Sequence, residues 1–575
     1  MKAIKSISGK DRLMPLLLTA SVLFLAVMVF LHTRKANYST LELYDILAVC
    51  ESVPDPVFTV PEGIYDQPFE LEIQAPAGYT IYYTTDGSIP TIRSFRYQNP
   101  ITIDPRKNPN KDIMFVRTSL WWRPPFGQQN HCNVVRARCF KDSVGYGKVI
   151  NTIYSNSQIL EHEGFQVVHI LMEADSLFSP KRGIYVKGEK YYSKKTRIAM
   201  DTIHEIIPDC FYPANYHQRG KNWTRPAEFI LTDSNGKTML EQSIQLCIHG
   251  MASRANPLKS LRIVADSVRG DHLIRHRFFN DLPYDTFRSI ILRNSGNDMG
   301  LTMFRDAMLQ QAVKEIGLDI QEYAPAVVYI NGNYWSIHNI REKMDENYLA
   351  IKYDADLDKI EILDFYKTMT VYYGDVQSST SFESLVDFIE NHSLSDTIAY
   401  QYVCEQMDVD NFIDYMIVET FYANLDWAVN NTRLYRIGHQ TETMKQKNIE
   451  AGKWRWFLID LDYSVYDTPL MNMFERLKND FPYFVTTIFF ALLENPEFKE
   501  KFLTRYEFII NNYMTSQRML QYIEEFEERY QSEIKRLIAR WRRPMLMQAW
   551  QSSVDFMKDF LLERPDIVLE QLKAL

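Results

Sequence analysis

The chain contains few cysteines and no excess of basic residues, and both features exclude classes of function. Its six cysteines among 575 residues have neither the density of a disulfide scaffold nor the spacing of a zinc site. The formal net charge is -9, whereas nucleic-acid binding calls for a basic patch or stripe. We therefore expect no nucleic-acid partner. Cys132 and Cys139 are expected to pair only in an oxidising compartment, and Cys247 and Cys404 lie in apolar runs typical of buried thiols.

The sequence also lacks the glycine-rich loops of common nucleotide-binding folds. No Gly-x-Gly-x-x-Gly occurs, so neither a dinucleotide fold nor an ordinary protein kinase loop is indicated. Gly236-Lys237-Thr238 resembles the end of a P-loop, but Leu231 stands where the first glycine is required. Asp233-Ser234-Asn235-Gly236, between two apolar runs, indicates a β-hairpin turn instead. Any nucleotide site must therefore be built in another way.

An uncharged run from Leu13 to Leu31 is the first long apolar feature. As a helix it would reach about 28 Å, close to the thickness of the hydrocarbon core of a membrane. The basic residues before it favour a cytoplasmic N-terminus and an extracytoplasmic bulk. We expect residues 1–36 to form a cytoplasmic tip and a single-pass transmembrane anchor, with a linker over 37–53. A cleaved signal peptide is the alternative, although the run is longer than the usual apolar segment of one.

Residues 54–160 show short apolar or alternating runs separated by turns. Phe69–Ile73 alternates apolar and charged residues, and Asp86-Gly87 has the composition of a tight turn with a positive φ at the glycine. This spacing predicts an antiparallel β-sandwich of about a hundred residues. The insertion over 106–129 contains two adjacent tryptophans, and we expect it to pack onto the sandwich.

The same region resembles a known accessory module. The run Tyr82–Ser88, followed by Pro90-Thr91, resembles the signature of the chitobiase/β-hexosaminidase C-terminal domain, which is immunoglobulin-like. The resemblance implies a structural role for Asp86 and Gly87 and leaves contact of the sandwich with a glycan open.

From residue 164 the chain mixes strands with longer helical stretches, and from about residue 471 the helical period dominates. Phe498–Tyr513 and Ser516–Trp541 place apolar residues at steps of three and four, as amphipathic helices require. We expect an α+β domain over 164–550 with a helical C-terminal part, followed by a helical tail over 551–575.

Two acidic motifs late in the mixed region are the strongest candidates for chemistry. Asp460 and Asp462 flank one leucine after the apolar run Trp456–Ile459, which predicts a buried strand. Residues two apart point to the same side of a strand, and two such carboxylates repel unless a cation or a proton lies between them. With Asp426 and Asn431 they offer oxygen ligands for magnesium and an aspartate for an acceptor hydroxyl. The alternative is that Asp-Leu-Asp merely begins a turn.

Phosphates also require a positive partner. In the segment His249–Arg262, the Ser253-Arg254 pair leads through a proline to Lys259. Lysine neutralises phosphate as a point charge, and arginine binds it with a planar fork. The other interpretation of an isolated strand lysine is a solvated or salt-bridged residue.

The segment His249–Arg262 resembles the pattern Arg-Gly-x-Ser-Ser-Arg-x-x-Pro-Lys-Lys-Ser-Phe-Arg of the CotH (spore coat protein H) kinase family. The ordered set of matches is far more specific than any one of them. Over residues 165–550 the further matches are Leu292–Asp298, Arg305–Ala307, Tyr329–Trp335, Arg341–Asp345, Asn424–Asp426, Asn430-Asn431 and Asp460–Tyr463.

The resemblance implies an atypical, magnesium-dependent kinase that transfers phosphate from ATP to serine-rich protein. Carried over by position, Asp426 would be the catalytic aspartate, and Asn431, Asp460 and Asp462 would hold magnesium. The side chains expected at the ATP phosphates are Lys259, Arg254 and Ser253, with Glu342 as the partner of Lys259. Two departures remove positive charge, because His249 and Leu258 stand where the family has arginine and lysine.

Three functions remain open at this stage. The first is an ATP- and magnesium-dependent protein kinase acting on exported or cell-surface protein at a bacterial membrane. The second is a non-catalytic surface scaffold, in which the sandwich docks to glycan or protein. The third, a glycan-processing enzyme, is weakest, because the chitobiase-type module is an accessory domain and no glycosidase acid pair is identifiable.

Overall fold

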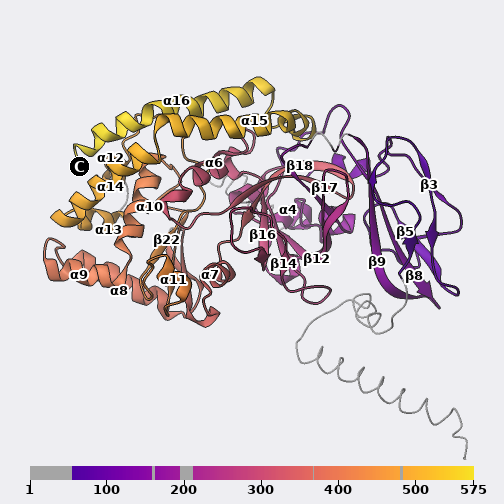
Figure 1. Ribbon diagram of the computed structural model, residues 1–575, viewed down its shortest axis with the longest axis horizontal. Helices are drawn as coiled ribbons and strands as arrows, with labels where there is room; N and C mark the ends of the chain where they lie inside the picture. The colour runs from indigo at the N-terminus through magenta and orange to yellow at the C-terminus, as the bar shows by residue number, and fades with distance from the viewer. Residues whose placement is uncertain (1–54, 158, 160–161, 194–211, 367, 480–482) are drawn as a thin grey trace, which may run out of the picture.

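The computed structural model describes residues 55–575 except 158, 160–161, 194–211, 367 and 480–482. A β-rich domain, a β-barrel and a mainly helical region follow one another along the long axis of the molecule (Figure 1). The predicted transmembrane anchor falls in residues 1–54, outside the described ranges. Within those ranges, no helix combines the length and the apolar character that a membrane span needs.

The N-terminal β-rich domain is built around a five-stranded sheet in the order β2-β9-β8-β5-β6, with two further strand pairs, β1-β4 and β3-β7. The prediction of a β-rich N-terminal domain is therefore confirmed. Gly87 has φ +84 in the predicted turn, as expected. The strands are β1 (Val57–Phe58), β2 (Gly63–Ile64), β3 (Phe69–Leu71), β4 (Ile73–Gln74), β5 (Thr80–Thr84), β6 (Phe95–Arg96), β7 (Ile101–Ile103), β8 (Asn133–Lys141) and β9 (Val144–Ser155).

The insertion over 106–129 packs differently from the prediction. Its first part, with the helical turn η2 (Lys111–Phe115), contacts the sheet, where the Asn110 side chain donates to the Thr85 carbonyl. It also contacts Asn333 beyond the β-rich domain, which accepts from Asn108 Nδ2 at 2.9 Å. Its second part leaves the β-rich domain: Thr118 Oγ1 donates to the Pro257 carbonyl at 2.8 Å. The prediction that the insertion packs onto the sandwich is thus right only for its beginning.

The cysteines form no disulfide in the described part of the chain. Cys132 and Cys139 are buried free thiols; Cys139 lies on β8, and Cys132 directly precedes that strand. Two side chains seven positions apart along one extended segment cannot bring their sulfur atoms together. The conditional prediction of a Cys132–Cys139 pair is therefore wrong for this fold.

Seven strands form a closed barrel in the order β10-β11-β12-β13-β16-β18-β17. All neighbours are antiparallel except β10 and β17, which are parallel. The hairpin predicted at Asp233–Gly236 joins β11 and β12, with Gly236 at φ +75. The elements of this part are β10 (Gln166–Leu171), α3 (Ala174–Phe178), α4 (Gly188–Tyr192), η5 (Asn215–His217), η6 (Lys221–Trp223), β11 (Arg225–Thr232), β12 (Thr238–Ile248), η7 (Ala252–Ala255), β13 (Leu261–Ala265), β14 (Ile274–Arg275), β15 (Thr286–Phe287), β16 (Ser289–Arg293), η8 (Gly296–Asp298), α6 (Arg305–Ala312), η9 (Lys314–Ile316), β17 (Tyr323–Ile330) and β18 (Asn333–Glu342).

A second sheet, in the order β20-β19-β21-β22, follows the barrel. Helix α7 begins directly after β18, because Asp345 caps its N-terminus by accepting from the amides of Asn347 and Tyr348. The predicted strand before Asp460 is present and buried as β22. The elements are α7 (Glu346–Tyr353), η10 (Leu357–Lys359), β19 (Ile360–Tyr366), β20 (Thr368–Tyr373), α8 (Gln377–Asn391), α9 (Thr397–Gln406), α10 (Val409–Phe421), β21 (Thr432–Ile437), α11 (Glu442–Gln446) and β22 (Arg455–Phe457).

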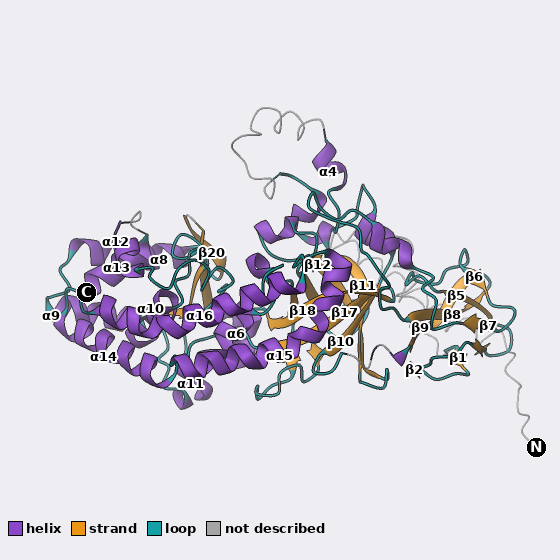
Figure 2. Cartoon of the chain, turned by 90° about the horizontal axis from the view of Figure 1, so that it is seen from above, coloured by secondary structure: helices purple, strands orange, loops and turns teal. Residues whose placement is uncertain are grey.

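The C-terminal part is helical, as predicted. Two long helices, α15 and α16, lie side by side and extend from the helical region toward the barrel (Figures 1 and 2). The boundary predicted at residue 550 is wrong, because it falls inside α16, whose Val554, Met557 and Phe560 are buried in the common core. The helices are α12 (Met473–Asn479), α13 (Phe484–Leu492), α14 (Pro496–Asn512), α15 (Ser516–Trp541) and α16 (Met547–Leu572).

Candidate active site

Asp460 and Asp462 lie in a turn after β22, where the second sheet meets the barrel. The strand ends at Phe457, and Asp460 itself has φ +58, a left-handed conformation that aspartate tolerates better than most residues. Leu461 between them is fully buried, and its N–H donates to Asp306 Oδ1 at 2.8 Å. The prediction that both carboxylates face one way is confirmed, but a turn anchored on α6 orients them, rather than the alternation of a strand.

Arg293, the last residue of β16, lies between these carboxylates. Its Nη2 donates to Asp460 Oδ1 and, at 2.6 Å, to Asp462 Oδ2. Its Nε lies 3.6 Å from Asp306 Oδ2. Burial opposes the charge of Arg293, but the surrounding carboxylates hold its pKa above the usual value. The barrel therefore supplies a fixed cation at the point where the two acidic side chains meet.

Asp462 is the buried member of the pair. Its carboxylate accepts from Asn297 N at 3.1 Å and from Asn297 Nδ2 at 2.9 Å. Burial, and next the Asp460 carboxylate, raise the pKa of Asp462 well above its usual range, against the pull of Arg293. Two carboxylates that repel each other this strongly stay together only if further positive charge or a shared proton lies between them.

Asp426 lies in the loop after α10 and is held by two neighbouring amides. Its Oδ1 accepts from Asn430 Nδ2 at 2.6 Å, and its Oδ2 accepts from Asn431 Nδ2 at 3.0 Å. Burial raises the pKa of Asp426, and the nearby Asp460 charge adds to this rise. The structure thus brings the predicted residues Asp426, Asn431, Asp460 and Asp462 together.

Glu419, on α10, and Asn424, in the loop that follows this helix, support this group. Asn424 Nδ2 donates to Glu419 Oε2 at 2.9 Å and to the Asp460 carbonyl at 3.4 Å, while Asn424 Oδ1 accepts from Asp426 N at 3.2 Å. Burial raises the pKa of Glu419 to about 8, so it is mostly protonated at neutral pH. This pair links the backbones of both acidic loops, and no sequence motif had pointed to Glu419.

The donor set suits magnesium bound together with phosphates. Magnesium takes one or two carboxylates from the protein and completes its shell with water and phosphate oxygens. Asp460 and Asp462 provide the carboxylates, and Asn430 Oδ1 is a buried oxygen without a hydrogen-bond partner in the described ranges. No group of three or more acidic, histidine or cysteine side chains is arranged around a metal position in those ranges. A dedicated all-protein metal cage is therefore not what these residues form.

Lys259 and Arg254 lie near the acidic group but point into their own loop. Lys259 Nζ donates to the carbonyls of Arg254 and Asn256, both at 2.7 Å, and lies 4.0 Å from the ring centroid of Tyr216. Arg254 donates to four backbone carbonyls, including that of Ile248 at 2.7 Å. Ser253 is half-buried in η7. Lys259 and Arg254 therefore stabilise the loop over 250–259 through backbone carbonyls.

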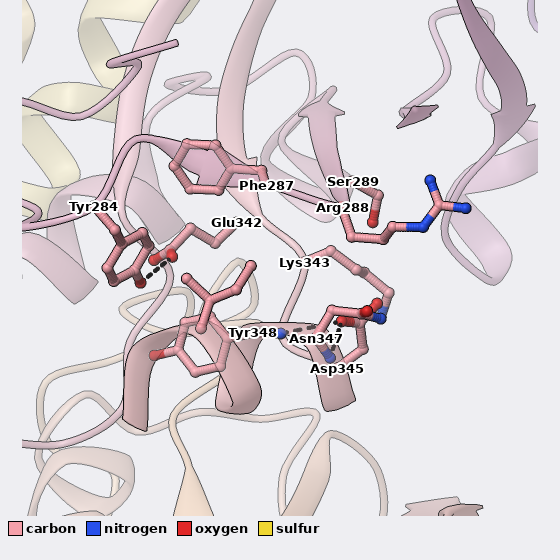
Figure 3. Close-up of a pocket in the computed structure, with 10 residues that line it drawn as sticks. Tyr284, Phe287, Arg288, Ser289, Glu342, Lys343, Asp345, Asn347 and Tyr348 are labelled. Carbon is pink, nitrogen blue, oxygen red and sulfur yellow. Dashed lines mark hydrogen bonds between the residues drawn. The ribbon is translucent and has the colours of Figure 1, made fainter. Parts of the chain in front are cut away.

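The predicted partnership of Glu342 with Lys259 is wrong. Glu342 Oε1 accepts from the Tyr284 hydroxyl at 2.6 Å, and Oε2 accepts from Glu322 N at 3.2 Å. Figure 3 shows the Glu342 carboxylate turned toward Tyr284, at one side of a small cavity of about 20 Å³. Burial raises the pKa of Glu342 to about 7. Its role here is to join β18 to the segment before β15.

The lysine that the sequence reasoning missed is Lys343, on the other side of that cavity (Figure 3). Its ammonium has no hydrogen-bond or ion-pair partner among the described residues and lies 5.1 Å from the ring centroid of Tyr372. Burial, and next the charges of Arg433 and Arg262, lower the pKa of Lys343 to about 7. Its position in the run Arg341–Asp345, which matches the family pattern, is the signal in the sequence that points to it.

His249 lies within range of the charges of Lys343 and Arg293. Burial lowers the pKa of His249 well below its usual value, and the charges of Lys343 and Arg293 act in the same direction. The imidazole is therefore neutral. Leu258, the other departure from the family pattern, is buried in the core. The positive charge that these two positions lack is supplied nearby by Lys343, Arg262 and Arg293.

Gly296 allows Asp462 to approach the barrel. Its φ is +58, and a Cβ at this position would lie 1.8 Å from Asp462 Oδ2. Gly296→Ala is expected to lower the free energy of unfolding by about 2–4 kcal/mol, because the left-handed strain and the displacement of a buried carboxylate add. Gly317→Ala is the matched control, since φ is +97 there and nothing lies within 4 Å of the added Cβ. Equal losses in urea unfolding would contradict the expected clash.

Comparison with known proteins agrees with this architecture. The profile of the chitobiase/beta-hexosaminidase C-terminal domain matches residues 60–109, within the β-rich domain. The profile described as CotH kinase protein matches residues 246–568, which is more than half of the chain and includes every residue of the candidate site. A comparison with curated proteins found no match. The chain belongs to the CotH kinase protein family.

Proposed function

We propose that this protein is a protein kinase that transfers the γ-phosphate of ATP, with magnesium, to serine or threonine hydroxyls of exported or cell-surface protein. The observation that carries the proposal is that Asp426 lies close enough to Asp460 for their charges to interact, while Arg293 holds Asp460 and Asp462 together. Membership of the CotH kinase family supports a kinase-like function. The carboxylates provide the two things that phosphoryl transfer needs from acidic residues, a metal site and a proton acceptor.

The proposed chemistry assigns separate tasks to the two acidic loops. The acceptor oxygen attacks the γ-phosphorus, the bond to the bridging β,γ-oxygen breaks, and the hydroxyl proton passes to Asp426. Asn430 and Asn431 keep the Asp426 carboxylate oriented, and its raised pKa suits it to accept a proton. Magnesium held by Asp460 and Asp462, with the Asn431 side chain as a further oxygen ligand, would neutralise phosphate charge.

The phosphates would lie between these carboxylates and the cations of the barrel. Lys343 has no protein partner for its ammonium among the described contacts, and Arg262 reaches the same region while it donates to Asp345 Oδ2 at 3.1 Å. Arg293 would share its carboxylates with the metal or turn toward a phosphate. Lys259, Arg254 and Ser253 would act through the backbone of the loop over 250–259 that they stabilise.

A non-catalytic scaffold is the second candidate, and one observation favours it. Arg293 already neutralises Asp460 and Asp462, so a metal must compete with a cation that belongs to the fold. A chain in which Arg293 never releases these carboxylates would keep the kinase fold without its chemistry.

The test is phosphate transfer from labelled ATP to the chain itself and to a serine-rich acceptor protein. We expect label incorporation by the full-length protein with magnesium and none after chelation with EDTA. Calorimetric titration with ATP and magnesium is the second measurement. Folded protein that binds neither would overturn the kinase proposal and favour the scaffold.

We also propose that Leu13–Leu31 anchors the chain in a bacterial membrane, with the described domains outside the cytoplasm. Protease treatment of intact cells should then cleave the described part and spare the N-terminal tip. Protection of the whole chain in intact cells would contradict this topology.

A further inference from the structure

The β-rich domain is joined to the barrel by a continuous set of contacts. Glu62 accepts from both the amide and the hydroxyl of Thr238, each at 2.7 Å. The Cys132 amide donates to the Gly332 carbonyl at 2.8 Å. Gly87 lies so close to Asn331 that a Cβ would be 2.2 Å from Asn331 Oδ1. Buried residues of β8 and β9 belong to the same hydrophobic cluster as the barrel, so the two domains form one packed body.

One contact of this body reaches the loop next to the candidate active site. Thr118, in the insertion of the β-rich domain, is fully buried, and its Oγ1 donates to the Pro257 carbonyl at 2.8 Å. Pro257 lies between Asn256 and Lys259, in the loop that Lys259 and Arg254 hold together. A carbonyl at this depth is costly to leave without a donor. The insertion therefore restrains the loop over 250–259 from outside the kinase-like domain.

The same loop is linked to the carboxylate group by two further steps. Asn256 Nδ2 donates to the Gly296 carbonyl at 3.4 Å, which is the longest hydrogen bond of this path. The next residue, Asn297, holds Asp462 with its amide and its side chain, at 3.1 Å and 2.9 Å. Hydrogen bonds, joined by two steps between adjacent residues of the backbone, thus lead from the β-rich domain through the loop to one of the proposed metal ligands.

We propose that Thr118 is a positioning residue for the active site, so that the β-rich domain acts as an internal support of the kinase-like domain as well as an outward-facing accessory module. The inference rests on the proposed function for its kinetic consequence. Its structural consequence, restraint of the loop over 250–259, does not depend on catalysis. A connected path is not in itself coupling, so the two consequences are tested separately.

The test compares Thr118→Val, which keeps the shape but removes the donor, with Thr118→Ser, which keeps the donor. The matched control is Thr84→Val, because Thr84 is also buried and its Oγ1 donates to the Ser88 carbonyl at 2.6 Å, within the β-rich domain. The first measurement is amide hydrogen exchange of residues 250–259 in the full-length protein. We expect Thr118→Val to speed exchange of this loop by about 2–10-fold, as the loss of one buried hydrogen bond predicts, and Thr118→Ser and Thr84→Val to leave it unchanged.

The second measurement is kinetic. Thr118→Val is expected to raise the KM for ATP with magnesium by about 2–10-fold with kcat within twofold, and Thr118→Ser is expected to restore the wild-type KM. If Thr118→Val does not fold, Thr118→Ala removes the hydroxyl without placing a methyl group against the Pro257 carbonyl. Unchanged exchange of the loop in the folded variant would overturn the inference. A wild-type protein that binds no ATP would overturn the proposed function alone, since the exchange result still decides the restraint.

Discussion

Asp426→Asn is expected to lower kcat for phosphate transfer by about 10²–10⁴-fold, the usual contribution of a positioned general base. The amide cannot accept the proton of the acceptor hydroxyl, although it can keep one of the hydrogen bonds now made by Asn430 and Asn431. Affinity for ATP with magnesium should change by less than threefold, because Asp426 is not a proposed metal ligand. Steady-state kinetics and calorimetric titration separate the two effects.

Asp467→Asn is the matched control for this prediction. Asp467 is exposed and lies five residues beyond Asp462 on the same segment, so its replacement removes a charge of the same kind without touching the site. We expect wild-type kcat for Asp467→Asn. Equal activity of Asp426→Asn and Asp467→Asn would remove Asp426 from the catalytic role and leave it as a structural residue of its loop.

Lys343→Met is expected to weaken binding of ATP with magnesium by about 10–100-fold, because a charged contact with phosphate contributes about 1.5–3 kcal/mol. The methionine side chain keeps much of the volume beside Tyr372 but carries no charge. Lys259→Met is the comparison variant, because the sequence predicted Lys259 as the lysine that binds phosphate. This substitution breaks two buried hydrogen bonds to carbonyls, so we expect mainly a loss of stability. The opposite ranking of the two variants in calorimetric titration would restore Lys259 as the phosphate lysine.

The pKa of Lys343 makes this prediction pH-dependent. It falls from an unfolded value of 10.5 to about 7 in the fold, so above pH 7 the free protein must take up a proton to present an ammonium to phosphate. The quantity to follow is the ratio of the wild-type affinity for ATP to that of Lys343→Met, because titration of ATP itself cancels in this ratio. The ratio should fall between pH 6 and 9, with a slope that approaches tenfold per pH unit. A ratio that does not change with pH would exclude the Lys343 ammonium from the phosphate contact.

The lowered pKa of Lys343 also predicts that replacing this lysine by methionine raises the free energy of unfolding at low pH. Between about pH 7 and 10.5 the unfolded chain binds more protons at Lys343 than the folded chain, so the free energy of unfolding of the wild type rises with pH in this window. The penalty for burying the charge is present in full below pH 7. Lys343→Met should therefore unfold at higher denaturant concentration than the wild type at pH 6, by roughly 1–3 kcal/mol, and this advantage should shrink toward pH 10.

Much of the site was predictable because its carboxylates occur in local motifs. Asp460 and Asp462 follow an apolar run and are separated by one buried leucine, so a shared direction could be inferred from spacing. Asp426 has two asparagines within five residues, and these hold its carboxylate. In each case the partners lie within a few residues along the chain, where sequence patterns carry geometric meaning.

The cationic side of the site was not predictable in this way. Lys259 and Lys343 both stand in family motifs at the ends of strands, and nothing in the local sequence distinguishes a lysine that donates to its own loop from one that has no partner. Both ammonium groups are buried. The difference is that the carbonyls of Arg254 and Asn256 accept from Lys259, whereas Lys343 lies near the charges of Arg262 and Arg433, which come from other strands. Likewise, Arg293 meets Asp460 and Asp462 across more than 160 positions of sequence.

The sequence by itself determined the family, the order of a β-rich domain before a mixed domain with a helical end, and the acidic members of the site. Periodicity, turn composition and short motifs express these features locally. Only the tertiary structure decided which lysine makes no hydrogen bond or ion pair within the described residues, that Arg293 lies between the carboxylates, and that the β-rich domain reaches the loop over 250–259. Those outcomes depend on burial and on contacts between distant segments, because the free energy of a charge in a fold is set by everything packed around it.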